Sequence, residues 1–130
     1  MTTPFARLGG EPTIAAITNH FYDLIDQDPA YAELRAIHAA DLSVVRNGLS
    51  HFLIGWAGGP RDWFERGQCV MSLHRAFPVT PALADQWSAA MARAIHAQPG
   101  IEPELAQAMT RALDHMAQGM INQTQDRTAA

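Results

Sequence analysis

The sequence predicts an all-α protein of one domain, and three observations support this prediction. In four long segments apolar residues recur at the three- to four-residue spacing of an amphipathic helix. No stretch alternates apolar and polar residues over a useful length, and no hairpin-turn dipeptide lies between β-branched runs. Proline and glycine stand at the ends of the apolar segments, where they start or stop helices. The length suits a single domain spanning 1–130.

The first part of the chain is expected to hold an arm, a long helix and a short helix. Residues 1–10 form the arm, which ends in a Gly-Gly turn signal. The long helix follows and ends near Asp26. Its apolar stripe consists of Ile14, Ile17, Phe21, Leu24 and Ile25. Tyr22 lies at the edge of that stripe, and Asp28 is expected to cap a short helix opened by Pro29.

The remainder predicts three more long helices around an irregular segment. Asp41 is the candidate cap of the first, which ends at the Gly-Gly-Pro of 58–60. Thr80 caps the second, and Pro103 opens the third. The other expected segments are the irregular stretch at 61–79 and a polar tail at 124–130.

Composition excludes several classes of function. The net charge of −4 argues against a surface for binding nucleic acid, which requires a basic face. A single cysteine allows no internal disulfide and favours a reducing compartment. The N-terminal segment does not resemble a secretory signal, and no apolar run approaches the ~20 residues of a membrane span. We therefore expect a cytoplasmic protein without nucleic-acid or membrane partners.

His74 is the candidate ligand for a metal or a haem iron. It lies in the apolar run CVMSLHRAFPV at 69–79, and Pro78 ends any helix there. Imidazole on such a stiff support is a common iron ligand, although a histidine satisfied within the core is the alternative reading. The remaining histidines lack a second ligand at useful spacing, and paired carboxylates or clustered ligands that would indicate a metal-dependent enzyme are absent from the sequence.

Tyr22, His38 and Trp87 are polar-tipped side chains that border apolar faces. Each needs a hydrogen-bond partner if it is buried, and a backbone carbonyl or water would suffice for any one of them. Together with an axial histidine they would form a donor-rich pocket opposite an iron.

These patterns together resemble the truncated haemoglobins, and specifically group II of that family. The resemblance rests on FYDLI at 21–25, GWAGGP at 55–60, HRAFPV at 74–79 and DQW at 85–87, with weaker matches at the Gly-Gly pair, at ADL and at MINQT. The tryptophan of DQW is the residue that points to group II. The segments cover nearly the whole chain.

The resemblance implies a globin-like, two-over-two helical sandwich around haem b. It implies that His74 is the proximal iron ligand and that Tyr22, Trp87 and His38 stabilise a distal ligand. The remaining residues expected to contact haem or its ligand are Val45, Leu49 and Phe77.

The implied function is binding of O2, CO, NO or peroxide at a five-coordinate iron with a polar distal pocket. Slow ligand release would suit oxygen binding, sensing or NO oxidation better than bulk oxygen transport. NO dioxygenase or peroxidase-like activity would need an external reductase, since the chain holds no electron-transfer motif. A monomer or a homodimer is expected.

The chain departs from the family pattern just before the proximal histidine. The run there reads GQCVMSL, is one residue shorter than usual, and carries Leu73 where an arginine that meets a haem propionate is common. Arg46, Arg66 and Arg75 are the candidates for that contact. A globin-fold interaction or sensor module that has lost haem binding is therefore the alternative function.

Overall fold

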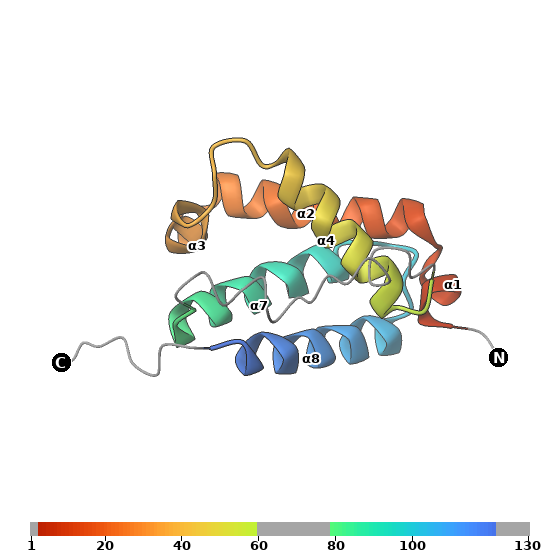
Figure 1. The fold of residues 1–130 in the computed structure, drawn as a ribbon. Coiled ribbons are helices and arrows are strands. Elements are labelled where there is room, and N and C mark those ends of the chain that lie inside the picture. The colour runs from red at the N-terminus through yellow and green to blue at the C-terminus, as the bar shows by residue number, and fades with distance from the viewer. Residues whose placement is uncertain (1–2, 60–78, 122–130) are drawn as a thin grey trace.

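The computed structural model describes residues 3–59 and 79–121, and these form helices, turns and no strand (Figure 1). No helix within these ranges is long and apolar enough to cross a membrane. The helical elements in chain order are α1 (Pro4–Leu8), α2 (Glu11–Gln27), the 3-10 turn η1 (Pro29–Tyr31), α3 (Ala32–Ala36), α4 (Ser43–Trp56), α7 (Pro81–His96) and α8 (Pro103–Gly119).

The four long helices lie in two layers of two. Helix α4 packs against α2, α8 packs against α7, and α2 contacts α7 across the layers (Figure 1). The short elements η1 and α3 extend from the end of α2 and reach α7. This arrangement confirms the all-α prediction and has the two-over-two form that was expected.

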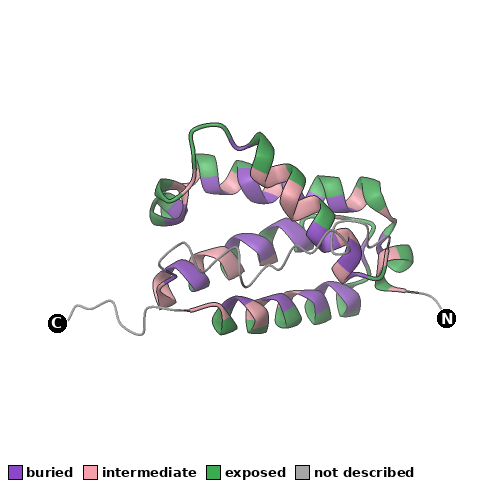
Figure 2. Cartoon of the chain, in the orientation of Figure 1, coloured by how far each residue is buried: buried purple, intermediate pink, exposed green. Residues whose placement is uncertain are grey.

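The core lies between the layers, where the buried sides of α2, α7 and α8 meet (Figure 2). Its largest fully buried side chain is that of Phe21 on α2. Met91 and Met109 are also buried, as expected for methionines that fill the core. Helix α8 supplies Leu105 and Leu113 to the same core from its inner side. The apolar stripes seen in the sequence therefore mark the faces that the helices bury.

The helix starts follow the capping residues closely. The Thr80 hydroxyl accepts a hydrogen bond from the backbone N–H of Leu83 at 3.1 Å, which confirms it as the cap of α7. A carboxylate oxygen of Asp28 accepts from the N–H of Ala30 at 3.0 Å. Asp41 does not itself cap α4. Its carboxylate accepts hydrogen bonds from the backbone N–H and the hydroxyl of Ser43, and α4 begins at Ser43. The helix therefore starts one residue later than predicted.

The N-terminal arm is more ordered than its composition suggested. It contains α1, which begins because the Thr3 hydroxyl accepts from the N–H of Ala6 and a proline occupies the first turn. The N–H of Phe5 donates to the carbonyl of Ala57 at 2.9 Å and ties the arm to the end of α4. Gly58 ends α4 with φ of 103°, a conformation that L side chains rarely adopt. The polar tail at 124–130 lies outside the described residues.

Candidate functional site

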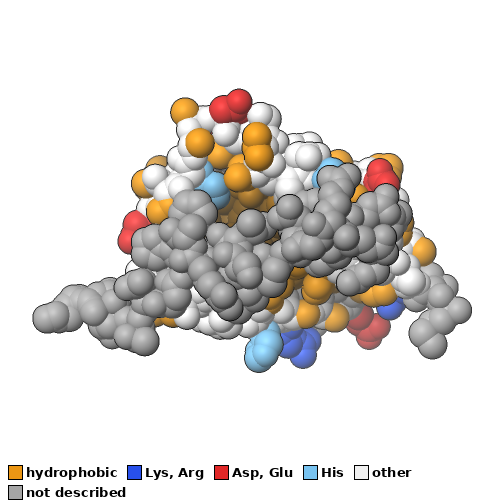
Figure 3. Space-filling view, in the orientation of Figure 1, with side chains coloured by type: hydrophobic (Ala, Val, Ile, Leu, Met, Phe, Trp, Pro, Cys, Tyr) orange, Lys and Arg blue, Asp and Glu red, His pale blue; other side chains and the backbone are white. Residues whose placement is uncertain are grey.

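The described residues include five of the predicted site residues, which come from four parts of the fold. Tyr22 lies on α2, His38 follows α3, Val45 and Leu49 lie on α4, and Trp87 lies on α7. On the face shown in Figure 3, hydrophobic side chains gather between the layer of α2 and α4 and the layer of α7 and α8.

The expected proximal residues are not part of this description. His74 and Phe77 lie outside the described residues. The haem-ligand role of His74 and the haem contact of Phe77 therefore stay predictions from the sequence.

Tyr22 is buried, with a relative exposure of 5%. It was expected at the edge of the α2 stripe, but neighbouring elements cover that edge. Its ring meets Phe21 edge-on at 4.9 Å and His38 edge-on at 5.9 Å between ring centroids. The guanidinium of Arg46 on α4 lies 5.7 Å from the centroid of the same ring. The Tyr22 ring is therefore enclosed from α2, from the turn after α3 and from α4.

The Tyr22 hydroxyl keeps its proton at neutral pH and is available as a donor. Burial raises the pKa of Tyr22 well above its ordinary value, and the positive charge of Arg46 opposes that rise only in part. Among the described side chains the buried polar atom without a hydrogen-bond partner is Ser88 Oγ on α7, not the Tyr22 hydroxyl.

His38 contacts the Tyr22 ring, and one hydrogen bond shows which of its ring nitrogens carries the proton. Its Nδ1 lies 2.8 Å from the carbonyl oxygen of Leu34, and because a carbonyl only accepts, Nδ1 carries the proton. In the neutral ring Nε2 is therefore an acceptor, and only the imidazolium can donate from Nε2. The expectation that His38 donates to a ligand consequently applies to its charged form alone.

Trp87 and Tyr22 both pack edge-on against Phe21. The Trp87 ring is half-buried and lies edge-on to Phe21 at a centroid distance of 5.5 Å. Sequence reasoning placed Phe21 in the core stripe but not in the site. Its position next to Tyr22 in the stripe was the available signal, and the structure shows that both candidate donors pack against Phe21.

Val45 and Leu49 supply an apolar wall. They are one helical turn apart on α4, are half-buried, and pack against the core. Neither carries a side-chain donor or acceptor. These two positions on α4 therefore offer no hydrogen bond to a ligand.

Arg46, adjacent to Val45, is already engaged with α2. Its Nη1 donates to the side-chain oxygen of Asn19 at 3.0 Å, and its Nη2 donates to a carboxylate oxygen of Asp23 at 3.1 Å. Arg46 had been one of three candidates for a haem propionate contact. In the described structure it bridges α4 and α2, and its contact with a haem propionate stays a prediction.

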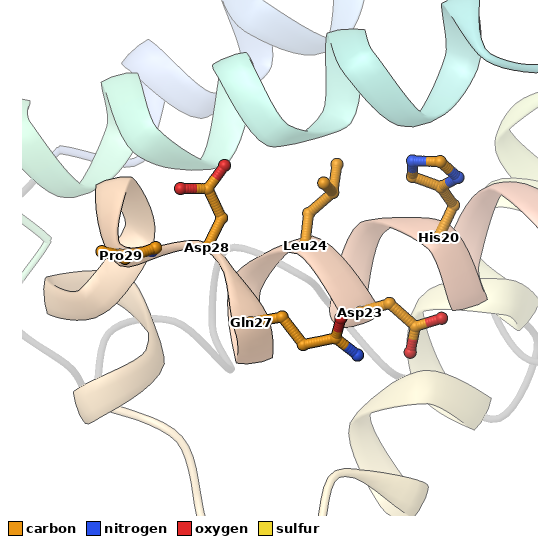
Figure 4. Close-up of a pocket in the computed structure, with 6 residues that line it drawn as sticks. All are labelled: His20, Asp23, Leu24, Gln27, Asp28 and Pro29. Carbon is orange, nitrogen blue, oxygen red and sulfur yellow. The ribbon is translucent and has the colours of Figure 1, made fainter.

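A second hollow lies elsewhere on the molecule. It is an open surface pocket of about 480 Å³, lined by His20, Asp23, Leu24, Gln27, Asp28 and Pro29 (Figure 4). In Figure 4 His20, Leu24 and Asp28 point toward α7, while Asp23 and Gln27 point away from it. Within the described ranges no group of three or more His, Cys, Asp or Glu side chains is arranged to hold a metal ion. None of the predicted site residues lines this pocket.

Comparison with known proteins gives a family and a fold. The family model of bacterial-like globins matches residues 3–122. A comparison with curated protein sequences gave no match.

Several solved structures share the whole fold. A cold-adapted truncated haemoglobin from the Antarctic marine bacterium Pseudoalteromonas haloplanktis TAC125 is 31% identical, with a TM-score of 0.89 over 95% of this chain and 100% of that one. A group II 2-on-2 haemoglobin from Agrobacterium tumefaciens is 32% identical, with a TM-score of 0.89 over 95% of this chain and 97% of that one. A group II truncated haemoglobin from Bacillus anthracis is 26% identical, with a TM-score of 0.84 over 99% and 97%.

These matches confirm the globin-like, two-over-two fold predicted from the helices. The family model spans nearly the whole sequence, and the relatives above the 30% level of identity are covered almost end to end. The chain belongs to the bacterial-like globin family of truncated haemoglobins.

Proposed function

We propose that this protein is a group II truncated haemoglobin that holds haem b through His74 and retains diatomic ligands with hydrogen bonds from Tyr22 and Trp87. One observation carries the proposal. The Tyr22 side chain is buried between His38 and Arg46, and burial raises the pKa of its hydroxyl, which stays protonated and able to donate.

The chemistry of the described residues fits a haem pocket. A porphyrin face needs an apolar wall, which Val45 and Leu49 supply, and a polar ligand above it needs a few donors without competing partners. Haem iron held by one histidine supplies an open position to which O2, CO or NO can bind. Under this proposal His74 holds the group from one side, and Tyr22 and Trp87 approach from the other.

The hydrogen-bond donors would set the rate of O2 dissociation. Tyr22 Oη–H and Trp87 Nε1–H can each donate to a ligand that accumulates negative charge. One such hydrogen bond contributes on the order of 1.5–3 kcal/mol, or about 10- to 150-fold in the rate of dissociation. Val45 and Leu49 exclude water from the same space without adding a donor of their own.

Protonation of His38 would add a third donor. Because its Nδ1–H is held by the Leu34 carbonyl, the neutral ring presents a lone pair to the pocket and the imidazolium presents an N–H. Slow O2 release suits NO dioxygenation or peroxide reduction with an external reductase in the cytoplasm.

The test is an absorption spectrum of the purified protein, with haem added if it emerges colourless. The parent should show a histidine-ligated haem spectrum, and His74→Ala should lose it together with most haem retention. His20→Ala and His115→Ala are the matched controls and should keep the parent spectrum. A normal spectrum in His74→Ala would refute the assignment, and a parent that binds no haem would favour the interaction or sensor module instead.

A further inference from the structure

We infer that Arg46 is a positioning residue for Tyr22: by bridging from α4 to α2 it fixes the ring that presents the hydroxyl to the ligand. The inference rests on the proposed function for its consequence in ligand binding. Its geometric part, that Arg46 immobilises the Tyr22 ring, stands on the described contacts alone.

The bridge has a fixed geometry. Asn19 and Asp23 are one helical turn apart on α2, so their side chains share a face, and Tyr22 lies beside that face. Nη1 of Arg46 donates to Asn19 Oδ1 at 3.0 Å and to the Asn19 carbonyl at 3.3 Å. Nη2 donates to Asp23 Oδ1 at 3.1 Å. With both Nη atoms anchored, the guanidinium is held 5.7 Å from the centroid of the Tyr22 ring.

The Tyr22 ring depends on such contacts for its orientation. The ring is held by the edge contacts with Phe21 and His38 and by the cation of Arg46. Removal of Arg46 takes away the contact from α4.

The charge of Arg46 also acts on the hydroxyl. A cation near the phenol stabilises negative charge on the oxygen, which makes the O–H a stronger donor. Burial raises the pKa of Tyr22, and the charge of Arg46 is the contribution that lowers it. Arg46 thus favours donation through position and through charge.

The same residue contributes little to the stability of the fold. The Arg46 side chain is 28% exposed and its partner Asp23 is 58% exposed, and ion pairs of this kind add little to the free energy of unfolding. If Arg46 had only a structural role, its replacement would therefore leave the motion of the Tyr22 ring and the rate of ligand dissociation almost unchanged.

Arg46→Met tests this, because methionine keeps a long apolar stem and removes the charge and the donors. Arg46→Lys restores the charge without the fork that reaches Asn19 and Asp23 together. Arg93→Met is the matched control, since Arg93 also pairs with a carboxylate, Asp28, at 2.8 Å and lies 5.8 Å from the centroid of a tyrosine ring, that of Tyr31.

The first measurement follows the Tyr22 ring itself. The sequence holds only two tyrosines, so a Tyr31→Phe background labelled with ¹³C-tyrosine reports on Tyr22 alone by NMR. We expect separate signals for the two ring edges in that background, as for a ring that flips slowly, and averaged signals after Arg46→Met. The purified protein is used as it is isolated, in the CO-bound diamagnetic form where haem is present.

The second measurement is ligand dissociation from the haem-loaded protein. We expect Arg46→Met to speed O2 dissociation at least about threefold with a smaller effect on CO, as for a weakened donor. Arg46→Lys should recover part of the difference, and Arg93→Met should remain within about twofold of the parent.

The outcomes separate the two proposals. Ring signals that are identical in Arg46→Met and its background would overturn the inference, whatever the haem result. A freed ring with unchanged O2 dissociation would support the positioning and overturn the distal role of Tyr22 in the proposed function. If Arg46→Met does not fold, Asp23→Ala removes one anchor of the bridge, and the same ring signals then decide.

Discussion

Two arginine–tyrosine pairs in this globin are built from the same parts but leave the tyrosine hydroxyl in different states. Tyr22 and Tyr31 are each 5% exposed, and an arginine lies 5.7 Å and 5.8 Å from their ring centroids. Each arginine also pairs with a carboxylate of a neighbouring element. Nη1 of Arg93 donates to the Tyr31 hydroxyl at 3.1 Å, whereas Nη1 and Nη2 of Arg46 donate to Asn19 and Asp23 and not to the Tyr22 hydroxyl.

The difference distinguishes a structural tyrosine from an available one. The Tyr31 hydroxyl is used within the fold, where it helps to hold η1 against α7 through Arg93. The donors of Arg46 are used by Asn19 and Asp23 on α2, so this arginine leaves the Tyr22 hydroxyl available to donate elsewhere. The two pairs therefore form an internal control. Replacement of tyrosine by phenylalanine should affect mainly ligand retention at Tyr22 and mainly stability at Tyr31.

The largest expected effect is on O2 release from the haem-loaded protein. Tyr22→Phe removes the available donor and should speed O2 dissociation about 10- to 150-fold. Tyr31→Phe removes a hydroxyl that is occupied elsewhere and should change the rate less than about twofold. Stopped-flow measurement of both variants and the parent makes the comparison. Equal rates for the two variants, with normal haem spectra, would remove the functional distinction between the pairs.

An intermediate effect is expected on stability at alkaline pH. An unfolded tyrosine ionises near pH 10, while burial raises the pKa of Tyr22 in the folded chain, so only the unfolded state loses this proton as the pH passes 10. The contribution of Tyr22 to stability is thus complete below pH 10 and is lost as the pH rises toward the raised folded pKa. One pH unit above 10 the loss is about 1.4 kcal/mol.

Denaturant unfolding between pH 9 and 11 measures this loss. Tyr22→Phe should remove that part of the alkaline decline, because phenylalanine has no proton to lose. Tyr31→Phe retains Tyr22 and should retain the decline that Tyr22 causes. A decline of the same size in Tyr22→Phe and the parent would show that the hydroxyl is solvated in the folded chain.

Much of the fold was readable from the sequence because periodicity reports which face a helix buries. The stripe that contains Ile14 and Phe21 located α2, and Thr80 with the proline after it located the start of α7. The start of α4 was misplaced because Asp41 supplies its hydrogen bonds from outside the helix. Rules that assign helix caps from local sequence fail where the side chain of a polar residue can form the hydrogen bonds of a turn instead of those of a cap.

The site was less accessible, because periodicity does not say what covers the flank of a helix. Tyr22 lies at the edge of its stripe and is buried only because His38 and Arg46 arrive from other elements. The side chain of Gln86 on α7 accepts a hydrogen bond from the N–H of Leu34, whose carbonyl in turn holds His38. Such long-range contacts carry no local signal. The polar tips of Tyr22, His38 and Trp87 singled them out in the sequence, and the family resemblance implied their shared role at a distal ligand.

The smallest expected effect is that of Trp87→Phe on O2 dissociation. It tests whether Trp87 is an available donor, as proposed for Tyr22, or part of the fold, as Tyr31 is. Trp87 is half-buried and packs edge-on to Phe21, so its ring is part of the core whichever role its indole N–H has. Trp87→Phe keeps an aromatic ring and removes the N–H. If that N–H serves a ligand, O2 dissociation should become several-fold faster, and CO, a poorer acceptor, should respond less.

Comparison of the two gases separates a lost donor from a loosened pocket. A smaller ring in place of indole leaves extra space, and extra space would speed O2 and CO release alike. A selective effect on O2 would therefore place Trp87 with Tyr22 as an available donor. Equal dissociation rates for Trp87→Phe and the parent, with a normal haem spectrum, would place it with Tyr31 as part of the fold and leave ligand retention to Tyr22.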